Sequence, residues 1–421
     1  MTKLLARILP KGAFARNVGL LVSGTAFAQG LAVLALPFLT RLYSPEDFSL
    51  LAVYVAIIGI GTVVSCLRYN IAIPIPESDT DAIALLIVSL LVATAASLVM
   101  ALPVLFAPIS TAKFLGQPGL ETYLWMVPVG IFVASAYNAL QFWTSRQGRF
   151  GLITRTRIER ALGGVGTQVA FGMTTPSAFG LLFGHMIYGG LGVIGLLRDI
   201  GRHDRSSLGS ISRTRLLQQA SRYRQFPIWS TPEALFNTAG VQVPVLLIAA
   251  AAAGPEAGFL MLAMRVMGLP MGIVGQSVAQ VYLAEAPRRL RADDLSQFTR
   301  RTMMKLLIRG APPIVAIGLL SPFAFPYVFG TEWARAGVIV AWMTPWFVLQ
   351  FVTSPVSMML HVTGRTMLAM VLQALGLALR VGPLVVHAYL DPALLPEIFA
   401  ISSAVFYSVY LLVLLKIIPK I

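Results

Sequence analysis

The sequence has little charge, few acidic side chains and a single cysteine. Only 12% of its 421 residues are charged, whereas a soluble domain has roughly 25%. One cysteine, Cys66, excludes an intrachain disulfide framework. A Gly-rich phosphate loop, a cluster of metal ligands and a nucleophile elbow are all missing, so no enzyme is predicted. The composition, 57% hydrophobic, instead favours a protein that lies in a membrane.

Twelve long apolar stretches run through the chain. A stretch of about 20 apolar residues crosses a hydrocarbon core roughly 30 Å thick as a helix. We expect spans at residues 17–39, 47–67, 82–107, 122–142, 158–174, 178–197, 232–253, 257–283, 305–328, 335–360, 367–390 and 397–415. The connections between them are short, so the chain is predicted to be an all-α polytopic membrane protein without a soluble domain.

Most of the positive charge lies in alternate connections. Of the 32 Lys and Arg, 27 lie in or close to the two tails and the even-numbered connections. Three fall in odd connections, at Arg41, Lys113 and Arg335, and two lie deep inside spans, at Arg265 and Arg380. The positive-inside rule then places both termini in the cytoplasm and predicts a twelve-helix inner-membrane protein. Because the excess charge follows topology, it does not indicate nucleic-acid binding.

The two halves of the chain look related. Pro45-Glu46 and Pro255-Glu256 each open the second span of a half, 210 residues apart. Such start signals are common in helices, but their matching positions favour a parallel repeat. We therefore expect an N-terminal six-helix lobe at 1–197 and a C-terminal six-helix lobe at 225–421. A basic cytoplasmic linker, 198–224, joins them, and a central cavity lies between the lobes.

The deep arginines are the first candidates for that cavity, because ionisable residues in spans usually face the bundle interior or water. At 1.5 Å per residue, Arg265 lies about 12 Å from the start of its helix and Arg380 about 20 Å from the start of its own. Arg265 shares a helical face with Gln276, and Arg380 shares one with Gln373. These polar stripes in apolar helices are typical of a cavity wall.

A structural role is the alternative for both arginines. Each one could bond backbone carbonyls left open near Pro270 or Pro383. Arg68, at the cytoplasmic edge of the second span, is a candidate for contacting a substrate headgroup during loading. A boundary arginine can equally be a snorkelling anchor.

Ion coupling has three candidates: Glu233, Asn237 and His185. Glu233 is the acid placed inside or against a span away from the periplasmic edge, and Asn237 shares its face. A titratable group there could couple transport to proton or sodium movement; no other cofactor is expected. The competing and favoured interpretation is a capping box over Ser230–Glu233, with Pro232 near the helix start. His185 is a second protonatable group, more typical of a packed histidine.

Five segments carry a resemblance to a known family: Leu39–Phe48, Leu67–Pro76, Tyr223–Pro227, Pro232–Asn237 and Leu262–Val266. They resemble the Wzx-type flippases of O-antigen and exopolysaccharide assembly, within the multidrug/oligosaccharidyl-lipid/polysaccharide (MOP) exporter superfamily. The resemblance implies a MATE-like V of two six-helix lobes around a cavity for an undecaprenyl-diphosphate-linked glycan. It also implies membrane lipids, a polysaccharide polymerase and a chain-length regulator as partners.

Arginine suits a diphosphate, being planar, permanently charged and able to fork to two oxygens. The predicted function is translocation of lipid-linked repeat units from the cytoplasmic to the periplasmic leaflet by alternating access, for lipopolysaccharide or exopolysaccharide synthesis. A membrane-embedded glycan polymerase is one alternative, but a large periplasmic loop would be expected of it. An ion-coupled multidrug exporter is the other, although organic cations call for acidic cavity walls.

Overall fold

Helices account for nearly all of the secondary structure. The computed structural model describes residues 13–205, 209, 211–252 and 254–418, and no β-strand occurs among them. In lipid each backbone amide must find its partner within the protein, and a helix satisfies this requirement within one segment. The all-α prediction is confirmed.

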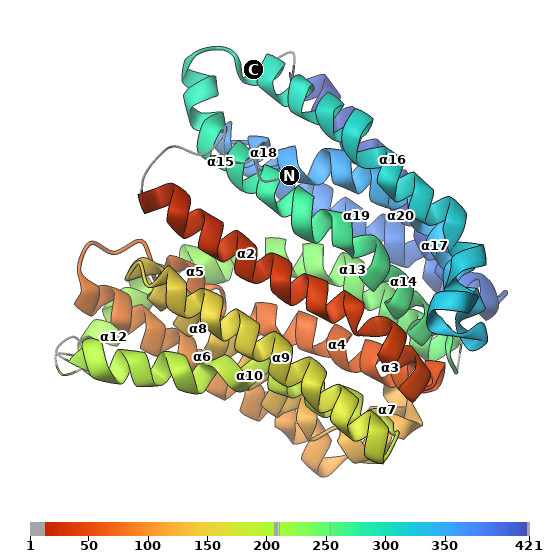
Figure 1. Ribbon diagram of the computed structural model, residues 1–421. Coiled ribbons are helices and arrows are strands. Elements are labelled where there is room, and N and C mark those ends of the chain that lie inside the picture. Colours follow the sequence, from red (N-terminus) through yellow and green to blue (C-terminus); the bar gives the residue numbers. More distant parts are fainter. Residues whose placement is uncertain (1–12, 206–208, 210, 253, 419–421) are drawn as a thin grey trace.

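The helices form two bundles joined by the short helix α12 (Arg213–Arg222). The N-terminal bundle contains α2 (Ala13–Leu34), α3 (Leu36–Leu42), α4 (Pro45–Ser65), α5 (Tyr69–Ala72), α6 (Asp79–Phe106), α7 (Pro108–Phe114), η1 (Pro118–Tyr123), α8 (Met126–Arg146), α9 (Phe150–Thr174) and α10 (Ala178–His203). The C-terminal bundle contains η2 (Phe226–Ser230), α13 (Thr231–Ala251), α14 (Glu256–Pro270), η3 (Met271–Gly275), α15 (Gln276–Arg291), α16 (Leu295–Phe329), η4 (Thr331–Trp333), α17 (Ala334–Thr353), η5 (Ser354–Val356), α18 (Met359–Val362), α19 (Thr366–His387), η6 (Pro392–Leu394) and α20 (Leu395–Ile417). Figure 1 shows the first bundle from red to lime and the second from green to blue, side by side.

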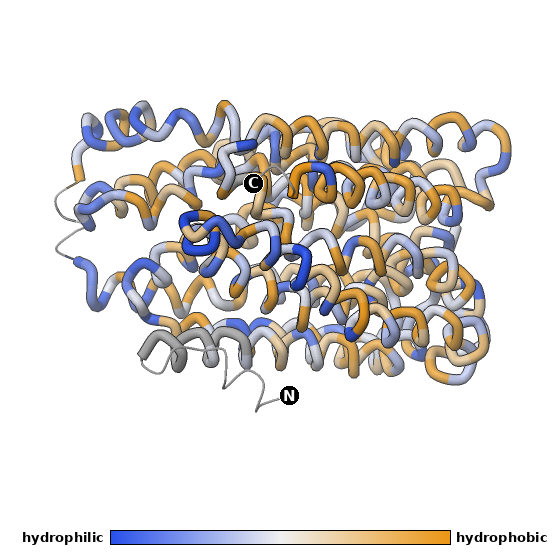
Figure 2. Tube along the Cα trace, turned by 90° about the horizontal axis from the view of Figure 1, so that it is seen from above, coloured by the Kyte–Doolittle hydropathy of each residue, from blue (hydrophilic) through white to orange (hydrophobic). Residues whose placement is uncertain are grey.

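Eleven helical segments of the described chain are long and apolar enough to cross a membrane. The twelfth long helix is α9, whose first half carries Arg155, Arg157, Glu159 and Arg160 and is therefore less apolar. About twelve helices in two lobes is the arrangement that the spans predicted. Figure 2 shows apolar residues along the helices and hydrophilic ones gathered toward their ends.

Local sequence chemistry explains where the helices begin and bend. Ser44 accepts a hydrogen bond from the amide of Asp47 at 3.2 Å, and Asp47 Oδ2 accepts one from the amide of Ser44 at 3.1 Å. This capping box, with Pro45 next to it, starts α4. In the C-terminal bundle α14 and α15 form one crossing, Glu256–Arg291, interrupted by the π-turn η3 directly after Pro270. Proline and π-turns are the usual causes of such bends.

The predicted linker 198–224 is helical over much of its length. Its first residues extend α10, and α12 packs against α6. Arg215 Nε lies 3.2 Å from Asp81 Oδ1, and the Tyr69 hydroxyl donates to the Ala220 carbonyl at 3.1 Å. We call this end of the molecule, where α6 begins and α12 lies, the basic end.

The opposite end, where α4 and α14 begin, is closed by contacts between the bundles, and we call it the sealed end. A Cβ on Gly258 of α14 would lie 2.0 Å from the carbonyl oxygen of Pro45 of α4. The two helices can approach this closely only because position 258 has no side chain, a device common at membrane helix interfaces.

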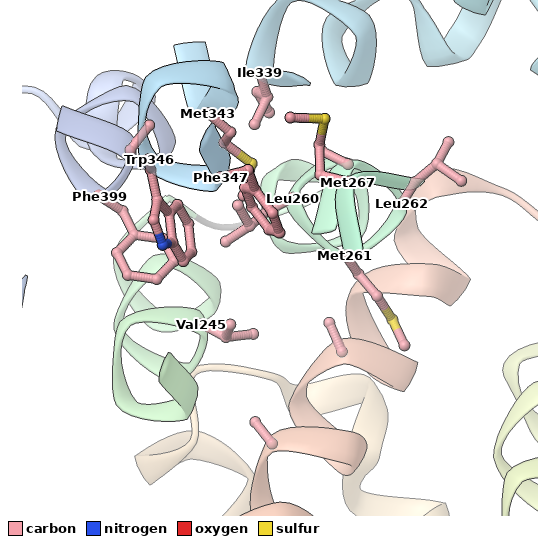
Figure 3. Packing of buried hydrophobic residues seen from close by; sticks show 14 of the residues in the cluster. Val245, Leu260, Met261, Leu262, Met267, Ile339, Met343, Trp346, Phe347 and Phe399 are labelled. Atoms are coloured by element: carbon pink, nitrogen blue, oxygen red, sulfur yellow. The ribbon is translucent and has the colours of Figure 1, made fainter. Parts of the chain in front are cut away.

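Aromatic and sulfur-containing side chains fill the C-terminal bundle. Trp346 of α17 is buried, with its ring centroid 4.8 Å from Phe347 and 4.9 Å from Phe399 of α20. Figure 3 shows these rings near Met343 and Leu260, so α14, α17 and α20 pack as one layer. Trp346 and Phe347 of this packing also line the space between the lobes.

Candidate functional site

A cavity of about 450 Å³ lies between the two bundles. Its walls come from α2, α9 and α10 on one side and from α13, α14, η3, α15 and α17 on the other. The polar side chains that line it are Gln29, Gln168, His185, Tyr188, Arg265, Gln276 and Gln350. Arg265 is the permanently charged member of this set, His185 is the titratable imidazole, and no carboxylate belongs to the lining among the described residues.

Arg265 provides the positive charge of the cavity. It extends from α14 toward Tyr188 of α10, so it faces the opposite bundle. No Asp or Glu of the described chain lies within 4 Å of its guanidinium group. A half-buried arginine without an acidic partner is suited to an anionic ligand, because it keeps its donors for the ligand's oxygens.

A second arginine, Arg160 of α9, also contacts Tyr188. Its guanidinium carbon is 3.7 Å from the ring centroid of Tyr137 and 4.6 Å from that of Tyr188, and it donates to the Tyr188 carbonyl. Sequence reasoning missed Arg160, because it was counted with the topology charges at the edge of its span. The available signal was its position inside the predicted span 158–174.

His185 lines the same cavity, one turn before Tyr188. Its ring centroid lies 5.8 Å from that of Tyr54 and 6.0 Å from that of Tyr188, and both Arg265 and Arg160 are close enough to act on it electrostatically. A proton on His185 would add a third positive charge beside two arginines. This position favours a packed, neutral imidazole over a proton carrier.

Gln276 also lines the cavity, on the first turn of α15 beyond the π-turn. The structure thus brings Arg265 and Gln276 together, as their spacing predicted. Gly268 and Gly272 lie between them on the lining; a Cβ on Gly268 would meet nothing within 4 Å. The glycines leave the wall open rather than filling it.

Arg380 lies outside the cavity lining. It is only 2% exposed, and its Nη1 donates to the Gly240 carbonyl of α13 at 3.2 Å. Four residues after Gly240, Pro244 lacks the amide hydrogen that would normally bond that carbonyl. Arg380 therefore bonds a backbone carbonyl left open by a proline, which is the structural alternative for this residue. The proline is Pro244 of the neighbouring helix α13 and not Pro383 of its own helix.

Aromatic rings enclose the rest of the Arg380 guanidinium group. Its carbon is 4.4 Å from the ring centroid of Phe406 and 5.3 Å from that of Tyr407. Tyr407 adjoins both Arg380 and Gln350, and Gln350 lines the cavity. Arg380 is thus connected to the cavity wall through Tyr407 and Gln350 and does not line the cavity itself. Gln373, half-buried on the same helix, also lies outside the lining.

Arg68 and Glu233, predicted as separate sites, act on each other at the basic end. Burial lowers the pKa of Arg68, and the nearby Glu233 carboxylate opposes that shift. Arg68 has a left-handed backbone with φ of 60°, and Leu67 before it has φ of 44°. Two successive non-glycine residues in this region are strained, and such strain tends to occur at functional sites. Neither Arg68 nor Glu233 lines the cavity.

The favoured capping box at Ser230–Glu233 is wrong. Ser230 is helical, with φ of −76° and ψ of −32°, and its side chain makes no capping hydrogen bond. The π-turn η2 runs directly into α13, so the helix begins at Phe226 instead of Thr231. Asn237, one turn after Glu233, is exposed and lies outside the cavity lining.

Hydrogen bonds between the bundles close the sealed end. Trp333 Nε1 donates to the Thr40 carbonyl at 3.0 Å, and Gln117 Nε2 donates to the Ala249 carbonyl at 3.0 Å. The Trp333 ring lies edge-on to Phe48, with centroids 4.8 Å apart. These contacts join backbone carbonyls and rings, with no ion pair between the bundles in the described part of this end.

Comparisons with known proteins identify the family and the fold of this chain. A family model described as "Polysaccharide biosynthesis protein" matches residues 38–337. The lipid II flippase MurJ in an inward closed conformation is similar in structure, with a TM-score of 0.67, 14% identity and coverage of 94% of this chain and 87% of that one. A search of curated proteins finds no significant match.

Two transporters of the MOP superfamily are similar over nearly their whole length. An inward-facing multidrug resistance MATE transporter has a TM-score of 0.54 and 15% identity, covering 95% of this chain and 96% of that one. A Pyrococcus furiosus transporter whose binding pocket has reverse polarity has a TM-score of 0.58 and 14% identity, covering 96% of both chains. The chain therefore belongs to the polysaccharide biosynthesis protein family and is a multi-pass membrane protein with the MOP-superfamily transporter fold.

Proposed function

We propose that this protein is a flippase for undecaprenyl-diphosphate-linked oligosaccharide repeat units. It moves them from the cytoplasmic to the periplasmic leaflet of a bacterial inner membrane by alternating access, during surface polysaccharide synthesis. The observation that carries the proposal is Arg265, a cation without an acidic partner in a cavity between two lobes. Membership of the polysaccharide biosynthesis family supports it independently.

The lining chemistry fits the parts of such a substrate. The guanidinium group of Arg265 forks to two oxygens of a diphosphate, and the glutamine amides and the Tyr188 hydroxyl offer hydrogen bonds to sugar hydroxyls. The polyprenyl chain would stay in lipid, where its apolar surface is already kept away from water. A cationic drug fits poorly, since it would meet Arg265 and no carboxylate within the described lining.

We assign the basic end to the cytoplasm and the sealed end to the periplasm, because positive charge is retained on the cytoplasmic side. The arrangement described is then closed toward the periplasm, and the substrate would load from the cytoplasmic leaflet. A cysteine at Ser212, an exposed residue before α12, tests this in a Cys66→Ser background. Labelling from outside intact cells would reverse the orientation; labelling only after permeabilisation supports it.

The coupling ion and the protein partners belong to the same proposal. Glu233, close to Arg68, is the group we propose for proton or sodium coupling, since His185 already faces two arginines. A polysaccharide polymerase and a chain-length regulator are the partners expected at the periplasmic face.

The test is transport by variants at Arg265, with Arg380 as the matched arginine outside the cavity. Arg265→Gln should abolish surface polysaccharide and trap lipid-linked glycan on the inner leaflet, while Arg265→Lys retains part of the activity. Arg380→Gln should instead reduce the amount of folded protein and leave activity per folded molecule near normal. Surface polysaccharide normalised to membrane-embedded protein separates the two patterns.

Two results would reject the proposal. One is full normalised activity in Arg265→Ala. The other is a deletion strain that keeps normal polysaccharide and becomes sensitive to organic cations, which would indicate a drug exporter.

A further inference from the structure

The helix α12 presents one half of its surface to the surroundings of the protein. The other half is fixed by Arg215 with Asp81, by the bond from Tyr69 to Ala220, and by the buried side chain of Tyr223. These contacts hold α12 beside the first turn of α6, which is the end of a membrane span. The exposed half of α12 therefore lies at the depth where lipid headgroups begin.

A shallow groove of about 590 Å³ runs along that exposed half. Its lining residues are Arg213, Thr214, Leu217, Gln218, Ser221 and Arg222, which we call the α12 groove. At 3.6 residues per turn these six positions cover one half of the helix, opposite the residues that pack on α6. The groove is thus a continuous surface with an arginine at each end.

The charge of the α12 groove is entirely positive. Between Asp204 and Glu233 the sequence contains no acidic residue. Arg215 is used in the contact with Asp81, whereas Arg213 and Arg222 are exposed and form no ion pair within the described residues. Arg222 keeps only a distant contact with the ring of Tyr223, 5.9 Å from its centroid.

Apolar side chains are exposed next to these arginines. Leu217, between them, is 63% exposed, and Trp229, shortly after α12, is 66% exposed. Exposed leucine and tryptophan beside arginine are typical of segments that lie in the membrane interface, where the apolar part enters the acyl region and the cations meet phosphates.

We propose that the α12 groove binds anionic phospholipids of the leaflet at the basic end. Arg213 and Arg222 are roughly 13 Å apart along the helix, so each binds the phosphate of a separate lipid. Thr214 and Ser221 place a hydroxyl next to each arginine, and Leu217 contacts the acyl chains between the two headgroups. The junction between the lobes is thereby attached to the membrane surface on the side of α6.

The test measures lipids retained by the full-length, detergent-purified protein in native mass spectrometry. Phosphatidylglycerol is compared with phosphatidylcholine for the native chain, Arg213→Gln, Arg222→Gln and the double variant. We expect each single variant to lose one phosphatidylglycerol and the double variant to bind it roughly 10- to 30-fold more weakly. Leu217→Ser should weaken retention less and keep the preference for the anionic lipid.

The matched control is Arg291→Gln/Arg300→Gln, which removes the same charge from exposed arginines of the C-terminal bundle. An equal loss in this control would overturn the proposal, because it would show a general charge effect. So would equal retention of phosphatidylcholine, or displacement of phosphatidylglycerol by millimolar inorganic phosphate, which would indicate a free-phosphate site. Unchanged lipid retention in both single variants would also overturn the proposal, and an acidic protein segment would then be the remaining candidate ligand of the α12 groove.

Discussion

The two ends of this molecule are held together by different chemistry. At the sealed end the lobes meet mainly through backbone carbonyls, indole rings and a glycine, as Gly258 and Trp333 show. Arg41 also donates to the Tyr327 carbonyl across the lobes there, but no described ion pair joins the lobes at this end. At the basic end charged side chains dominate, both between the lobes, where Arg68 lies near Glu233, and within the N-terminal lobe, where Arg149 pairs with Asp199 and Asp204. Close packing responds to shape and is insensitive to salt, whereas charged contacts respond to pH and ionic strength. The two ends should therefore fail under different perturbations.

The largest effect is expected from Gly258→Ala. The new Cβ would lie 2.0 Å from the Pro45 carbonyl oxygen, so α4 and α14 must separate. We expect surface polysaccharide to be lost. We also expect the sealed end to open, so that a cysteine at Gln350 in a Cys66→Ser background reacts faster with an impermeant maleimide added outside the cell. The rate should rise at least about tenfold, because about 1.4 kcal/mol of strain already gives that factor.

Gly268→Ala is the control for that experiment. It lies on the same helix, and its Cβ would meet nothing within 4 Å. Equal labelling in both variants, or a fully active Gly258→Ala protein, would show that the sealed end tolerates the extra volume.

At the basic end the prediction concerns Asp204. This carboxylate accepts hydrogen bonds from Trp143 Nε1 at 2.9 Å and from Arg149 Nη2 at 2.7 Å. Burial alone would raise its pKa, but the bonds from Arg149 and Trp143 outweigh burial and hold it below the usual 3.8. Asp204→Asn should lower the free energy of unfolding by about 2 kcal/mol, seen as a lower midpoint of thermal unfolding.

The sign of the pH dependence follows from that lowered pKa. The stability contributed by Asp204 is complete above its unfolded pKa of 3.8 and is lost as the pH falls through the lower folded value. The free energies of unfolding of the native and Asp204→Asn proteins should therefore differ most near neutral pH and become similar in acid. A constant difference across that range would assign the effect to packing instead of charge.

The smallest effect is expected from Trp333→Phe. An aromatic ring that can meet Phe48 is kept, while the hydrogen bond to the Thr40 carbonyl and part of the packing of the buried indole are removed. At about 1 kcal/mol per hydrogen bond, the balance should shift roughly fivefold toward the state open at this end. The cysteine-labelling rate at Gln350 measures the shift, and high salt should leave it unchanged; a strong salt effect would contradict the contrast between the ends.

The sequence predictions that agree best with the structure are those based on the length of apolar stretches and on the cost of burying charge. They located the spans, apart from extra turns at the basic end of α9, α15 and α16, and selected Arg265 and Gln276, which both line the cavity. The depth of a residue in a span follows from its sequence position. Its neighbours on other helices do not, because rotation and packing of helices depend on the assembled bundle.

Arg380 and Ser230 show that limit. The depth of Arg380 was clear, but its partner is a carbonyl opened by Pro244 on another helix, 140 residues away. Ser230 has the sequence of a capping residue, yet the π-turn before it keeps the helix continuous. Arg160 was missed because it lies near the end of its span, where a basic residue usually indicates only the orientation of the helix in the membrane.

The close approach of Gly258 to Pro45 also bears on the origin of the two halves. At the offset of 210 residues that relates Pro45-Glu46 to Pro255-Glu256, the counterpart of Gly258 is Phe48, which is fully buried against Trp333. A chain assembled from two copies of its first half would place a phenyl ring where only a hydrogen atom fits. The two halves are therefore not interchangeable at this junction, because Gly258 makes the close approach and Phe48 fills the matching position with a ring.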